Sequence, residues 1–214
     1  MNRRLLWDAC NTPDFMQDSD MTRAFIAIKL PTEVVRSLSI LQSGLKKQGL
    51  RLRWVHPDNI HLTLKFLGDV STEEMRAVKL VIRDVARRQS VFSLKARGLG
   101  VFPTVKKARV LWSGIHGDVS RLGNLQSNLE RALTDIGFDP DKRAFRGHLT
   151  LGRIKGRVDA RILASAISEF GSFASPPLAV ERLSLFKSEL KPSGAVYTEL
   201  CAEHLTRLTA KVAT

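Results

Sequence analysis

The chain of 214 residues carries 34 Lys and Arg against 21 Asp and Glu, which gives a formal net charge of +13. Its 43% of hydrophobic and 26% of charged residues exclude wholesale disorder and are typical of a globular protein. The length suits one domain, or two small lobes that share a core. So large a positive charge predicts a polyanionic partner, such as nucleic acid, a nucleotide or an anionic lipid.

The N-terminal segment differs in composition from the rest of the chain. Residues 1–20 combine two Arg with four Asp and precede the first apolar strand, so we expect a disordered extension followed by a single domain over 21–214. No stretch approaches the roughly 20 apolar residues of a membrane helix, and the opening residues lack the apolar run of a signal peptide. Cys10 and Cys201 lack the spacing of a disulfide scaffold. We therefore expect a reduced, cytoplasmic protein without a membrane partner, and a monomer by default.

Apolar spacing and turn residues predict strands and helices that alternate along the chain. In chain order the predicted elements are a strand at 24–30, a helix at 32–47, a strand at 61–67, a helix at 71–88 opened by the capping-box residues Ser71 and Glu74, strands at 92–96 and 109–115, a helix at 119–136, a strand at 148–154, a helix at 159–170, and strands at 178–186 and 195–201. These elements fall into two halves, which predicts two related lobes around a shared cleft.

Each half contains one strand with the sequence His-Leu-Thr-Leu, beginning at His61 and at His148. Because side chains alternate faces along a strand, His61 and Thr63 share one face while the leucines face the core, and the same holds for His148 and Thr150. Residues i and i+2 lie roughly 7 Å apart, so an imidazole and a hydroxyl can contact different oxygens of one tetrahedral anion. The repetition favours a joint function over two independently buried histidines.

Much of the positive charge surrounds these two motifs. The segment 46–65 has five basic residues and one acidic residue, and the segment 142–161 has seven and one. We expect this charge to form a field directed at the cleft, which attracts a phosphorylated ligand.

Two imidazoles that face one site favour concerted general acid–base catalysis. With an ordinary pKa of about 6.5, one ring can be neutral and its partner protonated near neutral pH. In-line attack at phosphorus places the entering and leaving oxygens on opposite sides, which suits two separate proton-transfer groups. Thr63 and Thr150 would bind the non-bridging oxygens, and the Arg153 guanidinium would stabilise their charge. Arg153 is an odd number of residues from His148, so it needs a bulge or a strand end near Gly152 to reach this face.

Metal binding is the competing use of these histidines. Neither motif supplies a third ligand at metal-binding spacing, so we expect no metal and no cofactor. The chain also lacks the phosphate-binding loop of nucleoside triphosphatases, the dinucleotide-binding GxGxxG motif and the GxSxG motif of serine hydrolases.

The two motifs and their surroundings resemble the 2H phosphoesterase superfamily, which is named for two H-x-[ST]-x motifs. Within it the chain is most similar to the bacterial and archaeal RNA 2′,3′-cyclic phosphodiesterases, historically called 2′-5′ RNA ligases. The resemblance is carried by RAFIAIKLP at 23–31, RWVHPDNIHLTLKFLG at 53–68, VLWSGI at 110–115, GHLTLGRI at 147–154 and LSLFKSELKPSGAVYTEL at 183–200.

The resemblance implies a bilobal α+β fold, with two pseudo-symmetric lobes of antiparallel sheet and outer helices around a central cleft. It implies metal-independent hydrolysis of an RNA-terminal 2′,3′-cyclic phosphate to a 2′-phosphate, with His61 as the general acid and His148 as the base. Thr63 and Thr150 would bind the phosphate, and Arg153 would assist the water or the phosphate. The family also joins tRNA halves through a 2′-5′ bond without ATP, so RNA ends of this kind are the implied partners.

Other functions stay open on the sequence alone. The pocket could serve a non-catalytic RNA- or nucleotide-binding module, although binding alone does not need two proton-transfer groups. The same chemistry could act on a small cyclic nucleotide or a 2′-5′ oligoadenylate. Phe25, Trp54 and Tyr197 could stack on a terminal base, although core packing is the simpler interpretation for the first two. The family often has Pro where this chain has Gly147, a departure that frees the loop and leaves the chemistry intact.

Overall fold

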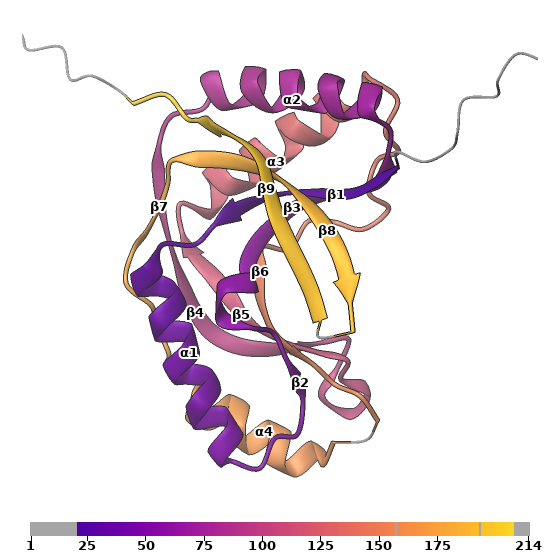
Figure 1. Ribbon diagram of the computed structural model, residues 1–214. Helices are drawn as coiled ribbons and strands as arrows, with labels where there is room; N and C mark the ends of the chain where they lie inside the picture. The colour runs from indigo at the N-terminus through magenta and orange to yellow at the C-terminus, as the bar shows by residue number, and fades with distance from the viewer. Residues whose placement is uncertain (1–20, 157, 193, 208–214) are drawn as a thin grey trace, which may run out of the picture.

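The computed structural model describes residues 21–207, apart from 157 and 193 (Figure 1). The predicted N-terminal extension and Cys10 lie outside the described residues. The elements follow in the order β1 (Thr22–Lys29), α1 (Thr32–Lys47), β2 (Arg53–Trp54), a short 3₁₀ turn (Pro57–Asn59), β3 (His61–Val70), α2 (Thr72–Arg87), β4 (Phe92–Phe102), a second 3₁₀ turn (Val105–Lys107), β5 (Val110–Gly117), α3 (Val119–Thr134), β6 (His148–Arg153), α4 (Ala160–Glu169), β7 (Leu178–Val180), β8 (Arg182–Lys191) and β9 (Gly194–His204).

In the described part of the chain, nine strands form one sheet in the order β7-β4-β5-β6-β3-β1-β8-β9, with β2 paired to β6. All of these pairings are antiparallel. The two HLTL strands are neighbours at the centre: β6 is followed outward by β5 and β4 on one side, and β3 by β1 and β8 on the other. The predicted two lobes are therefore the two halves of one continuous sheet, which are joined at β3 and β6.

The strand predicted at 178–186 was wrong in one respect, because it is two strands separated at Glu181. β7 pairs with β4 whereas β8 pairs with β1, so the chain changes neighbours between them. Since Glu181 alone connects an edge strand to a strand near the opposite edge, the sheet must curl until these parts approach each other. Two smaller differences are that β4 runs on to Phe102 and that the short strand β2 was not predicted.

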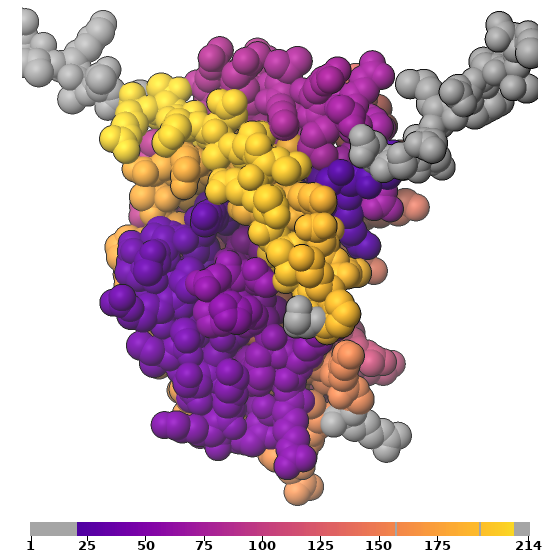
Figure 2. All heavy atoms as spheres, in the orientation of Figure 1, coloured from indigo at the N-terminus to yellow at the C-terminus, as the bar shows by residue number. Residues whose placement is uncertain are grey.

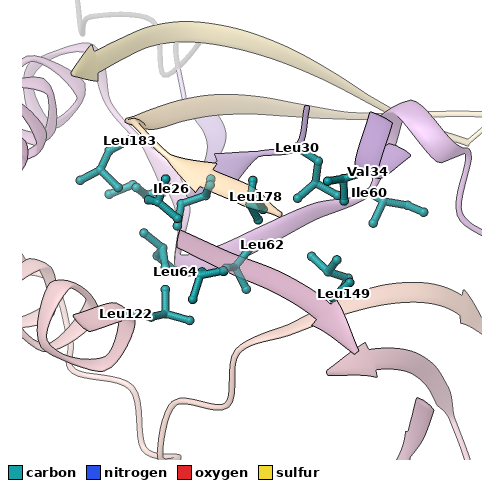
Figure 3. Close-up of a cluster of buried hydrophobic side chains, with 14 of the residues drawn as sticks. Ile26, Leu30, Val34, Ile60, Leu62, Leu64, Leu122, Leu149, Leu178 and Leu183 are labelled. Atoms are coloured by element: carbon teal, nitrogen blue, oxygen red, sulfur yellow. The ribbon is translucent and has the colours of Figure 1, made fainter. Parts of the chain in front are cut away.

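The helices cover one face of this curled sheet. α2 and α3 lie together at one end of the molecule and α1 and α4 at the other (Figure 1). Their apolar residues join the alternate residues of the strands in one large core, part of which Figure 3 shows. α2 begins with the predicted capping box, in which Ser71 and Glu74 exchange hydrogen bonds. None of the helices within the described residues has the length and apolar character needed to cross a membrane.

The opposite face of β1 carries a second, smaller apolar cluster. Phe25, Ala27 and Phe186 are buried there, with Tyr197 packed against them. β1 is therefore buried on both sides, since Ala24 and its i+2 and i+4 neighbours belong to the large core. This second cluster forms the floor of the site described next.

Candidate active site

The two HLTL strands meet at the centre of the sheet. β3 and β6 are antiparallel neighbours, with Leu62 opposite Leu149. On either side of this leucine pair, the antiparallel register places each histidine opposite the threonine of the other motif. Leu62 and Leu149 are fully buried in the large core (Figure 3), so His61 and His148 lie on the opposite face. The structure thus places both predicted histidines and both predicted threonines on one surface.

Backbone and aromatic contacts hold the His61 ring. Its Nδ1 donates a hydrogen bond to the carbonyl oxygen of Asn59 at 2.8 Å, which leaves Nε2 as the nitrogen available for proton transfer. One face of the ring stacks on Phe25, with centroids 4.6 Å apart, and Tyr197 makes an edge contact at 5.2 Å. The Asn59 side chain donates a hydrogen bond to the Ala195 carbonyl at 2.8 Å, which ties this turn to β9.

His148 has an equivalent arrangement in the other lobe. Its Nδ1 donates to the carbonyl oxygen of Arg146 at 2.7 Å, again two residues upstream of the histidine. Phe102 makes an edge contact with the ring at 5.1 Å, and Trp112 lies at 6.3 Å. Both rings therefore carry the Nδ1 proton and have Nε2 free, so the two motifs match in tautomer as well as in sequence.

Burial of the ring lowers the pKa of His61 from its ordinary value of 6.5. The hydrogen bond to the Asn59 carbonyl opposes this effect, whereas the positive charges of Arg153 and His148 add to it. Arg153 and His148 thus lie close enough to His61 to act on it electrostatically.

A β-bulge brings Arg153 to the site. Leu111 pairs with Gly152 and Trp112 with Thr150, so Leu151 is an extra residue in β6. Leu151 and Gly152 are both buried in succession, and Arg153 returns to the face of His148 and is exposed. The bulge that the sequence required near Gly152 is therefore present. Without it, strict alternation would have directed the Arg153 guanidinium into the core.

The first motif contains the same bulge. Ile26 pairs with Lys65 and Ala27 with Thr63, so Leu64 is the extra residue. As a result Lys65 faces the core, and Phe66 occupies the position that Arg153 holds in the other lobe. Phe66 is 64% exposed, and its ring lies 5.9 Å from that of Phe25. Sequence reasoning missed Phe66, although placing HLTLKF beneath HLTLGR aligns it with Arg153.

A groove of about 640 Å³ begins at the aromatic residues that contact His61. Its walls are the segment 53–59 and the β8–β9 hairpin, which lie side by side in Figure 2 as purple and yellow regions. Its lining includes nine basic or aromatic side chains: Arg23, Lys46, Arg53, Arg153, Phe25, Trp54, His56, Phe66 and Tyr197. Among the described residues, no Asp or Glu lines it. The Lys46 ammonium lies over the Trp54 ring, 5.6 Å from its centroid.

The positions of Phe25, Trp54 and Tyr197 can now be compared with the sequence interpretation. Phe25 is 2% exposed, stacked between His61 and Phe186, so it packs in the small apolar cluster. Trp54 and Tyr197 are half-buried and line the groove. Over the described ranges, no group of three or more His, Cys, Asp or Glu side chains is placed to hold a metal ion.

Comparison with known proteins places the chain among phosphoesterases. The family model "LigT like Phosphoesterase" matches residues 28–112 and 117–197. The RNA 2′,3′-cyclic phosphodiesterase of Methanothermobacter thermautotrophicus is 36% identical over 178 residues, 83% of this chain and 96% of that protein. The protein of the same name from Aeropyrum pernix is 34% identical, over 78% of this chain and 94% of that protein.

Solved structures give the same result. The apo form of E. coli LigT has a TM-score of 0.69 at 27% identity, covering 88% of this chain and 99% of that chain. E. coli LigT complexed with 3′-AMP has a TM-score of 0.70 at 27% identity, covering 87% and 99%. The predicted α+β fold with an antiparallel sheet and outer helices is confirmed by these structures. This protein belongs to the LigT-like phosphoesterase family.

Proposed function

We propose that this protein hydrolyses RNA-terminal 2′,3′-cyclic phosphates to 2′-phosphomonoesters, without a metal ion, by two-histidine general acid–base catalysis. The observation that carries the proposal is the matched pair of imidazoles, each with Nδ1 bonded to the backbone and Nε2 free. The names of the relatives supply the substrate class.

The proposed reaction uses both sides of the phosphorus atom. His148, neutral at Nε2, takes a proton from water, and the resulting hydroxide attacks phosphorus in line with the 3′ oxygen. The P–O3′ bond breaks, and His61 donates its Nε2 proton to O3′, which leaves a 3′-hydroxyl and a 2′-phosphate. Thr63 and Thr150 donate hydrogen bonds to the non-bridging oxygens, and the Arg153 guanidinium offsets the charge that accumulates there.

The acid in this scheme must hold its proton when substrate is bound. In the free protein, burial together with Arg153 and His148 lowers the pKa of His61 and so favours the neutral ring. A bound phosphodiester contributes a negative charge beside the ring, which raises that pKa. Binding of the substrate thereby favours the protonated form of His61, which the reaction needs as its general acid.

The composition of the groove favours RNA over a small cyclic nucleotide. Cationic side chains combined with exposed aromatic rings are the usual means of binding single-stranded nucleic acid, because the cations contact phosphates and the rings stack on bases. Lys46 and Trp54 lie on the side of the groove formed by α1 and β2, so they are placed to meet nucleotides upstream of the reacting end. A mononucleotide would leave this part of the groove unused.

The same site accounts for the ligation that the family resemblance implies. A ribose 5′-hydroxyl in place of water would lose its proton to His148 and attack phosphorus. The product would be a 2′-5′ phosphodiester with a free 3′-hydroxyl, formed without ATP because the cyclic phosphate is itself the activated group.

The test uses an oligoribonucleotide that ends in a 2′,3′-cyclic phosphate, incubated with excess EDTA. We expect a 2′-phosphate product, and a loss of about 10²–10⁴-fold in kcat for His61→Asn and for His148→Asn. His116→Asn is the matched control, because His116 is an exposed histidine on β5. A 3′-phosphate product, or full turnover by either site variant, would overturn the proposal. RNA binding by the wild type with no product would support the non-catalytic alternative.

A further inference from the structure

Lys65 differs from every other charged residue in the described part of the chain because it is buried, with 3% of its surface exposed. It lies two residues beyond Thr63 on β3, and the bulge at Leu64 turns it away from the site face. Its counterpart in the second motif, Gly152, has no side chain. The two lobes therefore differ at this position, and the reaction proposed above assigns Lys65 no role.

The Lys65 ammonium connects β3 to the segment that follows α3. Its Nζ lies 2.6 Å from Glu130 Oε1 on α3, 2.7 Å from the Asp139 carbonyl oxygen and 3.4 Å from Asp141 Oδ1. Glu130 Oε1 also accepts a hydrogen bond from the Asp141 backbone N–H at 2.6 Å, and its Oε2 accepts one from the Gln126 amide at 3.1 Å. Lys65 and Glu130 together bind the backbone at both Asp139 and Asp141.

This segment ends at the hydrogen bond that orients His148. Residues 139–146 form neither helix nor strand and lead directly into β6. Their backbone is hydrogen-bonded at Asp139 and Asp141 to the Lys65–Glu130 pair, and at Arg146 to the His148 ring. The Arg146 carbonyl that accepts the His148 hydrogen bond is therefore five residues along the backbone from the Asp141 N–H, which the pair holds.

We propose that Lys65 is a positioning residue for His148, acting through Glu130 and the segment 139–146. Because Lys65 is on the strand that carries His61, the same contact ties the two histidines to each other across the sheet. The inference rests on the proposed function for its effect on catalysis, whereas its effect on the His148 ring can be observed without any reaction.

The experiment compares Lys65→Met with a control that is destabilised elsewhere. Leu129→Ala removes a fully buried side chain from α3, next to Glu130 in sequence but in the apolar core. Both proteins are assayed at a temperature at which they are folded. For Lys65→Met we expect a kcat about 100-fold lower with KM little changed, since misplacement of a catalytic group by about 1 Å costs this much. We expect near wild-type kcat for Leu129→Ala.

The His148 ring is followed independently by NMR, through solvent exchange of its Nδ1 proton and its ring resonances. We expect faster exchange and shifted resonances in Lys65→Met and wild-type behaviour in Leu129→Ala. If the wild type lacks phosphodiesterase activity, the proposed function fails while this NMR result still decides the positioning role. Wild-type His148 resonances in folded Lys65→Met would overturn the inference, as would equal losses in Leu129→Ala.

A double variant guards against failure of Lys65→Met to fold. Replacing both members of a buried ion pair by apolar groups is often less harmful to stability than removing one, because no uncompensated charge is left. We expect Lys65→Met/Glu130→Met to unfold at a higher temperature than Lys65→Met and yet to show the same loss of kcat, since Asp139 and Asp141 are still unanchored. Recovery of kcat together with stability would show that Lys65 acts on the fold alone.

Discussion

Arg153 is expected to cost the protein stability while it serves catalysis. In the pairing of β2 with β6, Arg153 lies directly opposite Arg53, and both side chains are exposed. Residues opposite each other in an antiparallel pair point to the same face, so two positive charges repel there by about 0.2–1 kcal/mol. Arg153→Gln removes the repulsion and should raise the free energy of unfolding by that amount. For a domain of this size the melting temperature would rise by about 0.4–4 °C.

The same substitution should be severe for activity. Loss of one preorganised donor to the charge of the transition state typically lowers kcat by about 10²–10³-fold. Arg153→Lys should recover only part of this, because a lysine is a point charge without the planar fork of the guanidinium. Since Arg153 is one cause of the lowered pKa of His61, that pKa should also rise in Arg153→Gln.

Arg53→Gln is the matched control for this prediction. It relieves the same repulsion and should raise the melting temperature to a similar degree, while kcat at saturating substrate stays near that of the wild type and KM for an RNA rises, because Arg53 lines the groove. The assays are thermal unfolding, steady-state hydrolysis of a cyclic-phosphate RNA end, and NMR titration of the His61 ring. A melting temperature that falls by several degrees in Arg153→Gln would show that Arg153 stabilises the fold. In that case the repulsion inferred between Arg153 and Arg53 would be refuted.

Trp54→Ala should lower kcat/KM for an oligonucleotide by about 5- to 160-fold, which corresponds to about 1–3 kcal/mol of stacking energy. The kcat/KM for a 2′,3′-cyclic mononucleotide should stay unchanged, and equal losses on both substrates would argue against stacking upstream of the end. The pKa of His61 is lower in the folded state than in the unfolded chain. The free energy of unfolding that the neutral ring contributes is therefore fully present above pH 6.5 and is lost as the pH falls through the lowered pKa. Chemical denaturation should thus show a shallower acid-side decrease for His61→Asn than for the wild type, and parallel curves would contradict the burial of this ring. Leu62→Ala should reduce the free energy of unfolding by about 2–5 kcal/mol, because Leu62 is fully buried where the two lobes meet, and a loss below 1 kcal/mol would show that this contact is dispensable.

Sequence periodicity predicted the motif strands well up to the second leucine and poorly beyond it. Alternation holds from His61 to Thr63 and from His148 to Thr150 because the intervening leucines enter the core. The bulges at Leu64 and Leu151 then insert one residue each and reverse the side chains that follow directly, up to Phe66 in β3 and Arg153 in β6. A bulge depends on pairing with the neighbouring strand, which a local pattern does not contain.

Counting charges along the chain gave the right sign for the groove but few of its residues, because only Lys46, Arg53 and Arg153 of the described basic residues in the two segments line it. Lys65 was counted in the basic segment 46–65, but it is buried against Glu130 and Asp141 and contributes little to the field in the groove. Arg23, which is outside both basic segments, lines the groove instead. Ion pairing across the fold decides which charges reach a site, and residue counts along a chain cannot register it.

The hydrogen bonds that fix both Nδ1 atoms also constrain how the protein recovers after each reaction. In the proposed reaction His61 ends without its proton at Nε2, and His148 ends with one. Neither ring can flip to bring its Nδ1 proton to the substrate, because each Nδ1 donates a hydrogen bond to a backbone carbonyl oxygen. The starting protonation states must be restored at Nε2 by water or buffer once the product has left. At high substrate concentration this proton return becomes a candidate for the slow step, and it would appear as a dependence of kcat on buffer concentration.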